Sequence, residues 1–200
     1  MDKFKRLANH FYEAGYLKRT VRSGQRGYLT ADYTDTIASH TYRTAIIAWH
    51  LGTLVDDVDP NKLAAMALFH DLDEARSGDA DWVSKRYVKI NNDQINNDQS
   101  EGLDGRFLEL LEECDKKESI EAKLVKDADT LELILTLKEL AHSGNQEAIS
   151  WLKGLNFPHE PDDYNQLKYL LTSEGKQLGR VIYDTDPGEW WHFIATNKNL

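Results

Sequence analysis

Apolar side chains recur three and four residues apart along most of the chain, which is the spacing that places them on one face of a helix. Near the N-terminus this pattern predicts a helix over about 2–15, with an apolar stripe of Phe4, Leu7, Ala8, Phe11 and Tyr12. No window alternates cleanly between apolar and polar residues, as a half-buried strand would. We therefore expect an all-α protein.

The same spacing, together with residues that begin or end helices, predicts six further helices, over about 37–55, 60–76, 103–117, 119–142, 146–153 and 162–183. Asp59-Pro60 is typical of a helix start with proline in the first turn. The connections between helices are predicted from polar or turn-forming sequence: a basic loop over 17–35, a break at 77–79 and a loop over 154–163. Residues 91–100 are polar enough to form either an exposed turn or a solvated helix.

No repeat, charge block or glycine-serine tract divides the 200 residues, and the four prolines are dispersed. This favours one domain over 1–200, with core motifs in about 15–142 and a helical extension over about 146–200. No apolar run approaches the roughly 18 residues that a membrane span needs, and we expect no contact with a membrane. The N-terminal stripe is interrupted by charges, unlike a secretory signal.

The formal net charge is −10, which argues against binding a nucleic acid polymer, because phosphates are collected by a positive field. An anionic substrate would instead require a metal or a local group of cations. Cys114 is the one cysteine and cannot form an internal disulfide. That composition fits a cytoplasmic protein.

Polar groups interrupt the apolar faces of three predicted helices. The stripe Leu63, Ala64, Ala67 and Leu68 runs directly into His70, Asp71 and Glu74. Asp129 lies in line with Val125 and Leu133, on a face that should be core. Burying a bare carboxylate costs several kcal/mol unless something pairs with it. His40 stands one turn before the apolar stripe of the helix over 37–55.

Imidazole nitrogens and carboxylate oxygens are common ligands of divalent transition metals. Two histidines and two aspartates from three helices could satisfy one another through one cation. Each residue also has a simpler interpretation: His40 could bond the backbone at a helix end, and Asp129 could pair with a lysine. Asp127 competes with Asp129 for the same role.

The residues resemble the HD-domain metal-dependent phosphohydrolases, whose pattern is His…His-Asp…Asp. Here it reads His40 in "IASHTYRTAIIAW", His70-Asp71 in "ALFHDLDEARSGD" and Asp129 in "EAKLVKDADTLELIL". The order of the elements "LKR", "H..R.A..A", "HD..E...GD" and "K..D.LE" is most similar to the 5′-deoxynucleotidase subfamily of bacteria and its eukaryotic relatives. The resemblance implies an HD-fold helical bundle.

The resemblance also implies roles for individual residues. His40, His70, Asp71 and Asp129 would ligate the metal, and Glu74 would position a water. Asp79 would contact that water or the substrate sugar, Arg19 in "LKRTVR" would hold the phosphate, and Lys85 falls near a phosphate-side lysine. Ser39 replaces the acidic residue that usually precedes the first histidine.

Three further groups of residues are interpreted from their position in the chain. Trp82 follows the Ser77-Gly78-Asp79 turn and is a candidate contact for a nucleobase. The cations Lys18, Arg19, Arg22 and Arg26 would form either a phosphate clamp or a solvated loop. Trp190 and Trp191 are interpreted as packing or as a dimer contact, since relatives are commonly homodimers.

No histidine occurs from Leu72 to Ala141, which favours one metal ion over two. N/O ligation does not distinguish Mn, Co, Fe, Ni or Zn. We expect an enzyme that releases phosphate from deoxyribonucleoside 5′-monophosphates, a small-molecule nucleotide substrate. There are two alternatives. One is a deoxynucleoside triphosphate triphosphohydrolase on the same fold, and the other is a non-catalytic metal- or nucleotide-binding regulator.

Overall fold

The computed structural model describes residues 2–31, 33–155 and 162–196. These residues form helices and one isolated β-bridge, between Val21 and Thr36, which confirms the all-α prediction. Most of the predicted loop over 154–163 lies outside the described residues, as does the end of the C-terminal extension.

The described helices follow one another as α1 Lys3–Tyr16, α2 Ser23–Tyr28, α3 Ile37–Gly52, α4 Pro60–Phe69, α5 Glu74–Ser77, the 3-10 turn η1 Ser84–Arg86, α6 Asn92–Ser100, α7 Gly105–Lys116, α8 Ile120–His142, α9 Gln146–Lys153, the 3-10 turn η2 Asn165–Tyr169, α10 Ser173–Asp184 and α11 Glu189–Thr196. Side-chain caps begin the helices that carry the polar cluster. Thr36 and Ser39 form a reciprocal capping box at α3, and the Ser119 hydroxyl accepts from the Ala122 amide at α8.

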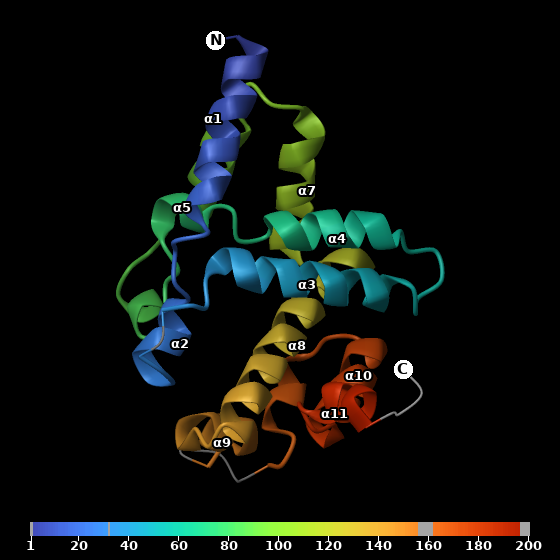
Figure 1. Ribbon diagram of the computed structural model, residues 1–200. Helices are drawn as coiled ribbons and strands as arrows, with labels where there is room; N and C mark the ends of the chain where they lie inside the picture. The colour runs from blue at the N-terminus through green and yellow to red at the C-terminus, as the bar shows by residue number, and fades with distance from the viewer. Residues whose placement is uncertain (1, 32, 156–161, 197–200) are drawn as a thin grey trace.

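The centre of the fold is formed by α3, α4 and α8. Helices α3 and α4 lie side by side, and α8 packs across them (Figure 1). Their fully buried side chains supply most of the apolar core, including Leu51, Leu63, Met66, Leu131 and Ile134. This packing brings His40 on α3, the end of α4 and Asp129 on α8 to one place.

The prediction of an uninterrupted helix over 60–76 is wrong. Helix α4 ends at Phe69, a turn spans 70–73, and α5 begins at Glu74. The His70 imidazole donates through Nδ1 to the carbonyl of Ala67 at 2.6 Å, the acceptor that residue 71 would use in a continued α-helix. The turn therefore replaces the helical face on which His70 and Glu74 were expected to stand.

The prediction of one long helix over 162–183 is also wrong. Its first part is the turn η2, and α10 starts only at Ser173. The buried carboxylate of Asp127 accepts hydrogen bonds from the Leu171 amide at 2.6 Å and the Thr172 amide at 2.8 Å. These amides cannot donate along a helix, so the chain breaks there and Thr172 caps α10.

Two polar segments are more ordered than the sequence indicated. The predicted loop over 17–35 contains α2 and the bridge between Val21 and Thr36. Residues 91–100 form α6, whose Gln99 side chain is buried and donates to the carbonyl of Leu72 at 3.0 Å. Polar residues in α6 therefore stabilise the turn after α4 and do not all face solvent.

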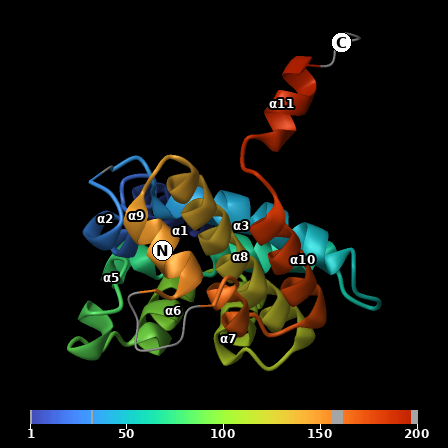
Figure 2. The ribbon, with the colours of Figure 1, turned by 90° about the horizontal axis from the view of Figure 1, so that it is seen from below.

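The C-terminal segment has two parts. Helix α10 packs against α8, whereas α11 projects from the rest of the molecule (Figure 2). Trp190 on α11 is 71% exposed. Among the described helices, none combines the length and apolar composition that crossing a bilayer requires.

Candidate metal centre

His40 is the most buried member of the predicted ligand set. The capping box at Thr36 fixes the first turn of α3, and His40 in the next turn is wholly buried against α8. Its Nδ1 lies 2.7 Å from Oε2 of Glu132. Its Nε2 points the other way, toward the turn that follows α4.

The other three predicted ligands surround that nitrogen. The Nε2 atom of His40 lies 3.2 Å from Oδ1 of Asp129, 3.4 Å from Nε2 of His70 and 3.5 Å from Oδ2 of Asp71. The His70 Nε2 and Asp71 Oδ2 atoms are 3.2 Å apart. His40, His70 and Asp71 form a group whose ligand atoms could hold one metal ion. The fold thus brings together all four residues that the sequence singled out as ligands.

The hydrogen bonds behind the imidazoles show that the donor set fits a cation. Nδ1 of His40 donates to the Glu132 carboxylate, and Nδ1 of His70 donates to the carbonyl of Ala67. Because both Nδ1 atoms donate to groups outside the cluster, each ring can direct an Nε2 lone pair into it, beside the carboxylate oxygens of Asp71 and Asp129. This outer support of metal-binding imidazoles is usual in metalloproteins.

The acid-base state of His40 reflects the carboxylates around it. Burial lowers its pKa, but hydrogen bonds to Asp129 and Glu132 outweigh burial and raise the pKa to about 9. The same contacts, with the nearby arginines Arg22 and Arg43, overcome the effect of burial on Glu132 and lower its pKa to about 2. A proton on His40 therefore occupies the place that a cation would take.

Asp129 makes both of the contacts that the sequence left open. Its Oδ1 faces His40, while its Oδ2 accepts from Nζ of Lys126 at 2.7 Å. Burial raises the pKa of Asp129, but Lys126 and the two histidines lower it well below its ordinary value. Asp127, the competing candidate, instead accepts from the amides of Leu171 and Thr172, just before α10.

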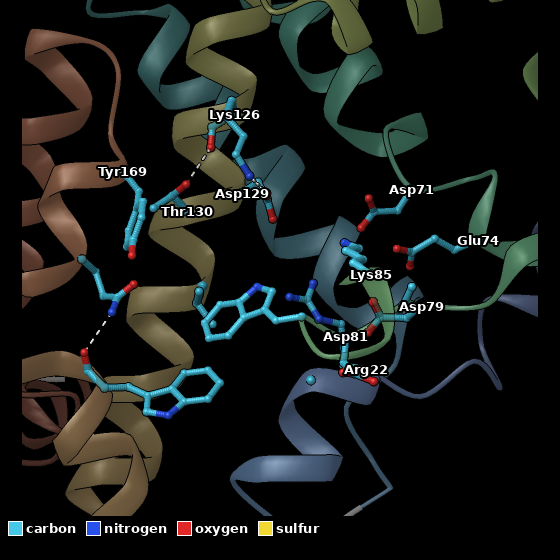
Figure 3. A pocket seen from close by; sticks show the side chains of 16 residues that line it. Arg22, Asp71, Glu74, Asp79, Asp81, Lys85, Lys126, Asp129, Thr130 and Tyr169 are labelled. Atoms are coloured by element: carbon cyan, nitrogen blue, oxygen red, sulfur yellow. Dashed lines mark hydrogen bonds and ion pairs between the residues drawn. The ribbon is translucent and has the colours of Figure 1, made fainter. Parts of the chain in front are cut away.

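Glu74 and Asp79 lie next to the cluster (Figure 3). The Oε2 atom of Glu74 is buried and accepts no hydrogen bond from the described residues. Burial raises the pKa of Glu74, and the carboxylates of Asp71 and Asp79 raise it further, to about 10. Asp79 is anchored, because its Oδ2 accepts from the amide of Ser23 at 2.6 Å.

These side chains open into a cavity of about 570 Å³. Asp71, Glu74, Asp79 and Asp129 line it, together with the cations Arg22, Lys85 and Lys126. Lys85 and Trp82, which the sequence suggested as substrate contacts, also line this cavity. These cations lie among carboxylates, and Lys126 is paired with Asp129, so an anionic substrate would need the charge of a bound metal ion as well.

Of the three residues predicted to bind substrate, Arg19 does not line this cavity. Its side chain is exposed, and its guanidinium lies 5.7 Å from the centre of the Tyr16 ring. Arg22 lines the cavity instead, since the bridge between Val21 and Thr36 and the bond from the Arg22 amide to the Asp35 carbonyl fix its backbone. Burial lowers the pKa of Arg22, but the carboxylates of Glu132 and Asp129 more than offset this and raise it.

Sequence reasoning gave no role to Glu132, Lys126 or Arg22 individually. Signals for them existed: Lys126 and Glu132 each stand three residues from Asp129, within reach on the same helix. Arg22 belongs to the basic segment over 17–35, and the sequence alone does not indicate which of its cations reaches the site.

Comparisons with known proteins agree with this geometry. The family model "HD domain" matches residues 14–155, more than half of the chain. The 5′-deoxynucleotidase HDDC2 of Danio rerio is 36% identical over 134 residues, which cover 62% of this chain and 64% of the relative. The dATP triphosphohydrolase of Salmonella phage PMBT28 is 29% identical over 134 residues, covering 62% and 63%. This chain thus spans just under two thirds of the length of these relatives.

Among solved structures, a predicted metal-dependent phosphohydrolase from Magnetospirillum magnetotacticum superposes with a TM-score of 0.66, covers 91% of each chain and is 16% identical, a likeness of fold. The chain belongs to the HD domain family. Family membership and the converging His, His and Asp ligand atoms together indicate a divalent metal cofactor.

Proposed function

We propose that the protein is a metal-dependent phosphohydrolase that releases inorganic phosphate from deoxyribonucleoside 5′-monophosphates. The observation that carries the proposal is one cavity in which inward-facing ligand atoms, a buried acid and three cations meet. The name of the Danio rerio relative supports the choice of substrate.

His40, His70, Asp71 and Asp129 would hold one divalent ion, with Glu132 orienting His40 from behind. When bound, such an ion offsets phosphate charge and lowers the pKa of water. The absence of histidine from Leu72 to Ala141 favours one ion over two. Nitrogen and oxygen ligands of this kind bind Mn, Co, Fe, Ni and Zn alike, so they do not identify the metal.

The protein's own residues then perform the proton transfer and the binding. In the metal-loaded protein the charge of the ion would lower the raised pKa of Glu74. The ionised Glu74 would then take a proton from the attacking water at its buried Oε2, and Asp79 would orient that water or the sugar. Arg22 would donate to the phosphate oxygens, and Lys85 would offset their charge at the rim. The oxygen of water bonds to phosphorus, the bond from phosphorus to O5′ breaks, and the nucleoside leaves with a proton.

A triphosphohydrolase reaction is the second candidate, favoured by the name of the phage relative. Both reactions would use the same metal and Glu74. They differ in the product, which is inorganic phosphate in one case and triphosphate in the other.

The test is a screen of deoxyribonucleoside mono- and triphosphates with purified protein, in the presence of Mn, Co, Fe, Ni or Zn, beside elemental analysis. Phosphate release from monophosphates, lost with a chelator and absent from Asp71→Ala, is the expected result. Triphosphate as product would select the second candidate. Nucleotide binding without metal-dependent turnover would overturn both and leave a regulator.

A homodimer and a cytoplasmic location are further parts of the proposal. The exposed Trp190 and Trp191 on α11 offer apolar surface for a dimer contact. Sedimentation of the full chain would show whether it is a monomer.

A further inference from the structure

The cavity has two chemically different ends. Charged groups gather at the end formed by α8, α5 and the start of α2. The other end is lined by Trp82, Trp151, Gln166, Tyr169 and Leu133. Figure 3 shows Tyr169 across the cavity from Asp71 and Glu74, with Asp129 and Thr130 of α8 between them. The phosphate chemistry proposed above uses the charged end and leaves the aromatic end unexplained.

Two tryptophans form the floor of the aromatic end. The ring centres of Trp82 and Trp151 are 4.7 Å apart, with their planes inclined by 22°, which is a stacked arrangement. Trp151 is only 6% exposed, whereas Trp82 is 53% exposed. The pair therefore has an inner ring held by the core and an outer ring with surface available to a ligand.

Hydrogen bonds hold both the ring and the backbone of Trp151. Its Nε1 donates to Oε1 of Glu147 at 3.0 Å, one turn earlier on α9. The carbonyl of Trp151 accepts from the side-chain amides of Asn165 at 3.0 Å and Gln166 at 2.8 Å. Trp151 is thus held in place, and it supports Trp82 by stacking and η2 through the bonds from Asn165 and Gln166. This end of the cavity is therefore formed before a ligand binds.

Part of this wall comes from a segment outside the family model, which ends at residue 155. Gln166 and Tyr169 belong to η2, and η2 is anchored because Asp127 of α8 binds the amides just after it. The segment that follows α9 therefore completes the cavity whose other end holds the ligand cluster.

We infer that Trp82, stacked on Trp151 at the end of the cavity that Tyr169 also lines, is the subsite for the nucleobase of the substrate. The inference rests on the phosphohydrolase function proposed above. A flat ring with a π face is what two exposed aromatic side chains at one cavity end would bind best, and stacking of this kind is tolerant of base identity. The phosphate would lie at the charged end and the sugar beside Thr130.

A purely structural role is the competing explanation, in which the two indoles only hold the segment over 79–86 against α9. The two roles differ in what they do to a substrate that has no base. 2-Deoxyribose 5-phosphate carries the sugar and phosphate of a deoxynucleotide but nothing to stack, so it reports on the charged end alone.

The experiment measures kcat/KM of the full-length, metal-loaded protein for deoxynucleoside 5′-monophosphates and for 2-deoxyribose 5-phosphate. Trp82→Ala should lower the ratio of the two values about five- to one-hundred-fold, mainly through KM of the nucleotide, because stacking on one aromatic ring is worth that much. Trp82→Phe should restore most of the ratio, and Tyr169→Ala should lower it in the same direction. Trp49→Ala, a comparably exposed tryptophan on α3 outside the cavity, should leave the ratio unchanged.

Equal losses for both substrates in Trp82→Ala would show a structural role and overturn the inference. An unchanged ratio in Trp82→Ala and Tyr169→Ala would overturn it as well, with the phosphohydrolase function intact. Failure of the wild-type protein to hydrolyse either substrate would instead refute the proposed function itself.

Discussion

His40 of α3 and Glu132 of α8 are joined by a hydrogen bond of 2.7 Å between Nδ1 and Oε2, at a point where both side chains are buried. The other oxygen of Glu132 accepts from Arg43 at 2.8 Å. The carboxylate is therefore held ionised from one side and orients the imidazole on the other. This pair lies behind the ligand atoms and sets the direction of the His40 lone pair.

Replacing Glu132 by Gln should weaken metal binding about 10- to 100-fold, because the amide supports His40 less strongly than a carboxylate does. Glu139→Gln is the matched control, since Glu139 also pairs with Arg43 but does not contact His40. Competition with a chelator measures both affinities. Equal affinities in the two variants would remove Glu132 from the metal site.

Glu74→Gln should retain the metal and bind nucleotide, but lose about 100- to 10,000-fold in kcat, because the amide cannot accept the proton of the attacking water. Elemental analysis and steady-state kinetics on the same preparation separate the two effects. Wild-type turnover in this variant would assign the proton transfer to another group.

Arg22→Ala should lower kcat/KM about 10- to 100-fold, as expected for the loss of a charge-assisted hydrogen bond to phosphate. Arg19→Ala should change it by less than about twofold, since exposed charges far from the reacting atoms contribute little. The two variants remove the same charge from the same segment. A larger loss in Arg19→Ala would restore the prediction made from the sequence.

Metal binding should strengthen as pH rises. The pKa of His40 is raised from its ordinary value to about 9 in the metal-free protein, so the metal must displace a proton. Apparent affinity should then rise about tenfold per pH unit up to about pH 9.

The stability of the metal-free protein should change with pH in the opposite direction. The contribution of His40 to stability is complete below its unfolded-state pKa and is lost as pH rises through about 9. Metal titrations and thermal unfolding at several pH values measure these trends, and a flat affinity would contradict them.

Gly175→Ala should destabilise the fold by about 1–3 kcal/mol, because a Cβ at this position would overlap the buried carboxylate of Asp127. Gly15→Ala is the control, since a Cβ there has open space and the substitution should stabilise by about 0.4–1 kcal/mol. Urea unfolding of the metal-free variants gives both values. A neutral Gly175→Ala would show that α10 can move away from α8.

The sequence predicted the helices of the centre and the four ligand candidates because these depend on local periodicity and on residue types that stand out in an apolar stripe. It did not predict the end of α4 at Phe69, since the competing bond from His70 to Ala67 forms only in the folded turn. The family resemblance implied Arg19, in the element "LKR", and a basic loop carries no periodicity that would have pointed to Arg22 instead. The bridge between Val21 and Thr36, which selects Arg22, is a contact between distant residues.

The aromatic end of the cavity could not be predicted from the sequence either. Trp82 was a candidate by its position, but its partner Trp151 is distant in the chain and read as part of a short helix. Tyr169 was placed in a long helix that the structure replaces with a turn. Tertiary contacts, and not local pattern, decide which residues meet there.

Asp127 and Asp129 stand two positions apart on α8, one serving the start of α10 and the other the ligand cluster. A chain truncated after Lys153 would remove the amides of Leu171 and Thr172 that bind Asp127 and would uncover the face of α8 on which α10 packs. The part of the protein beyond the family model is thus not a dispensable appendage. Helix α8, which carries Asp129, would lose one of the elements packed against it.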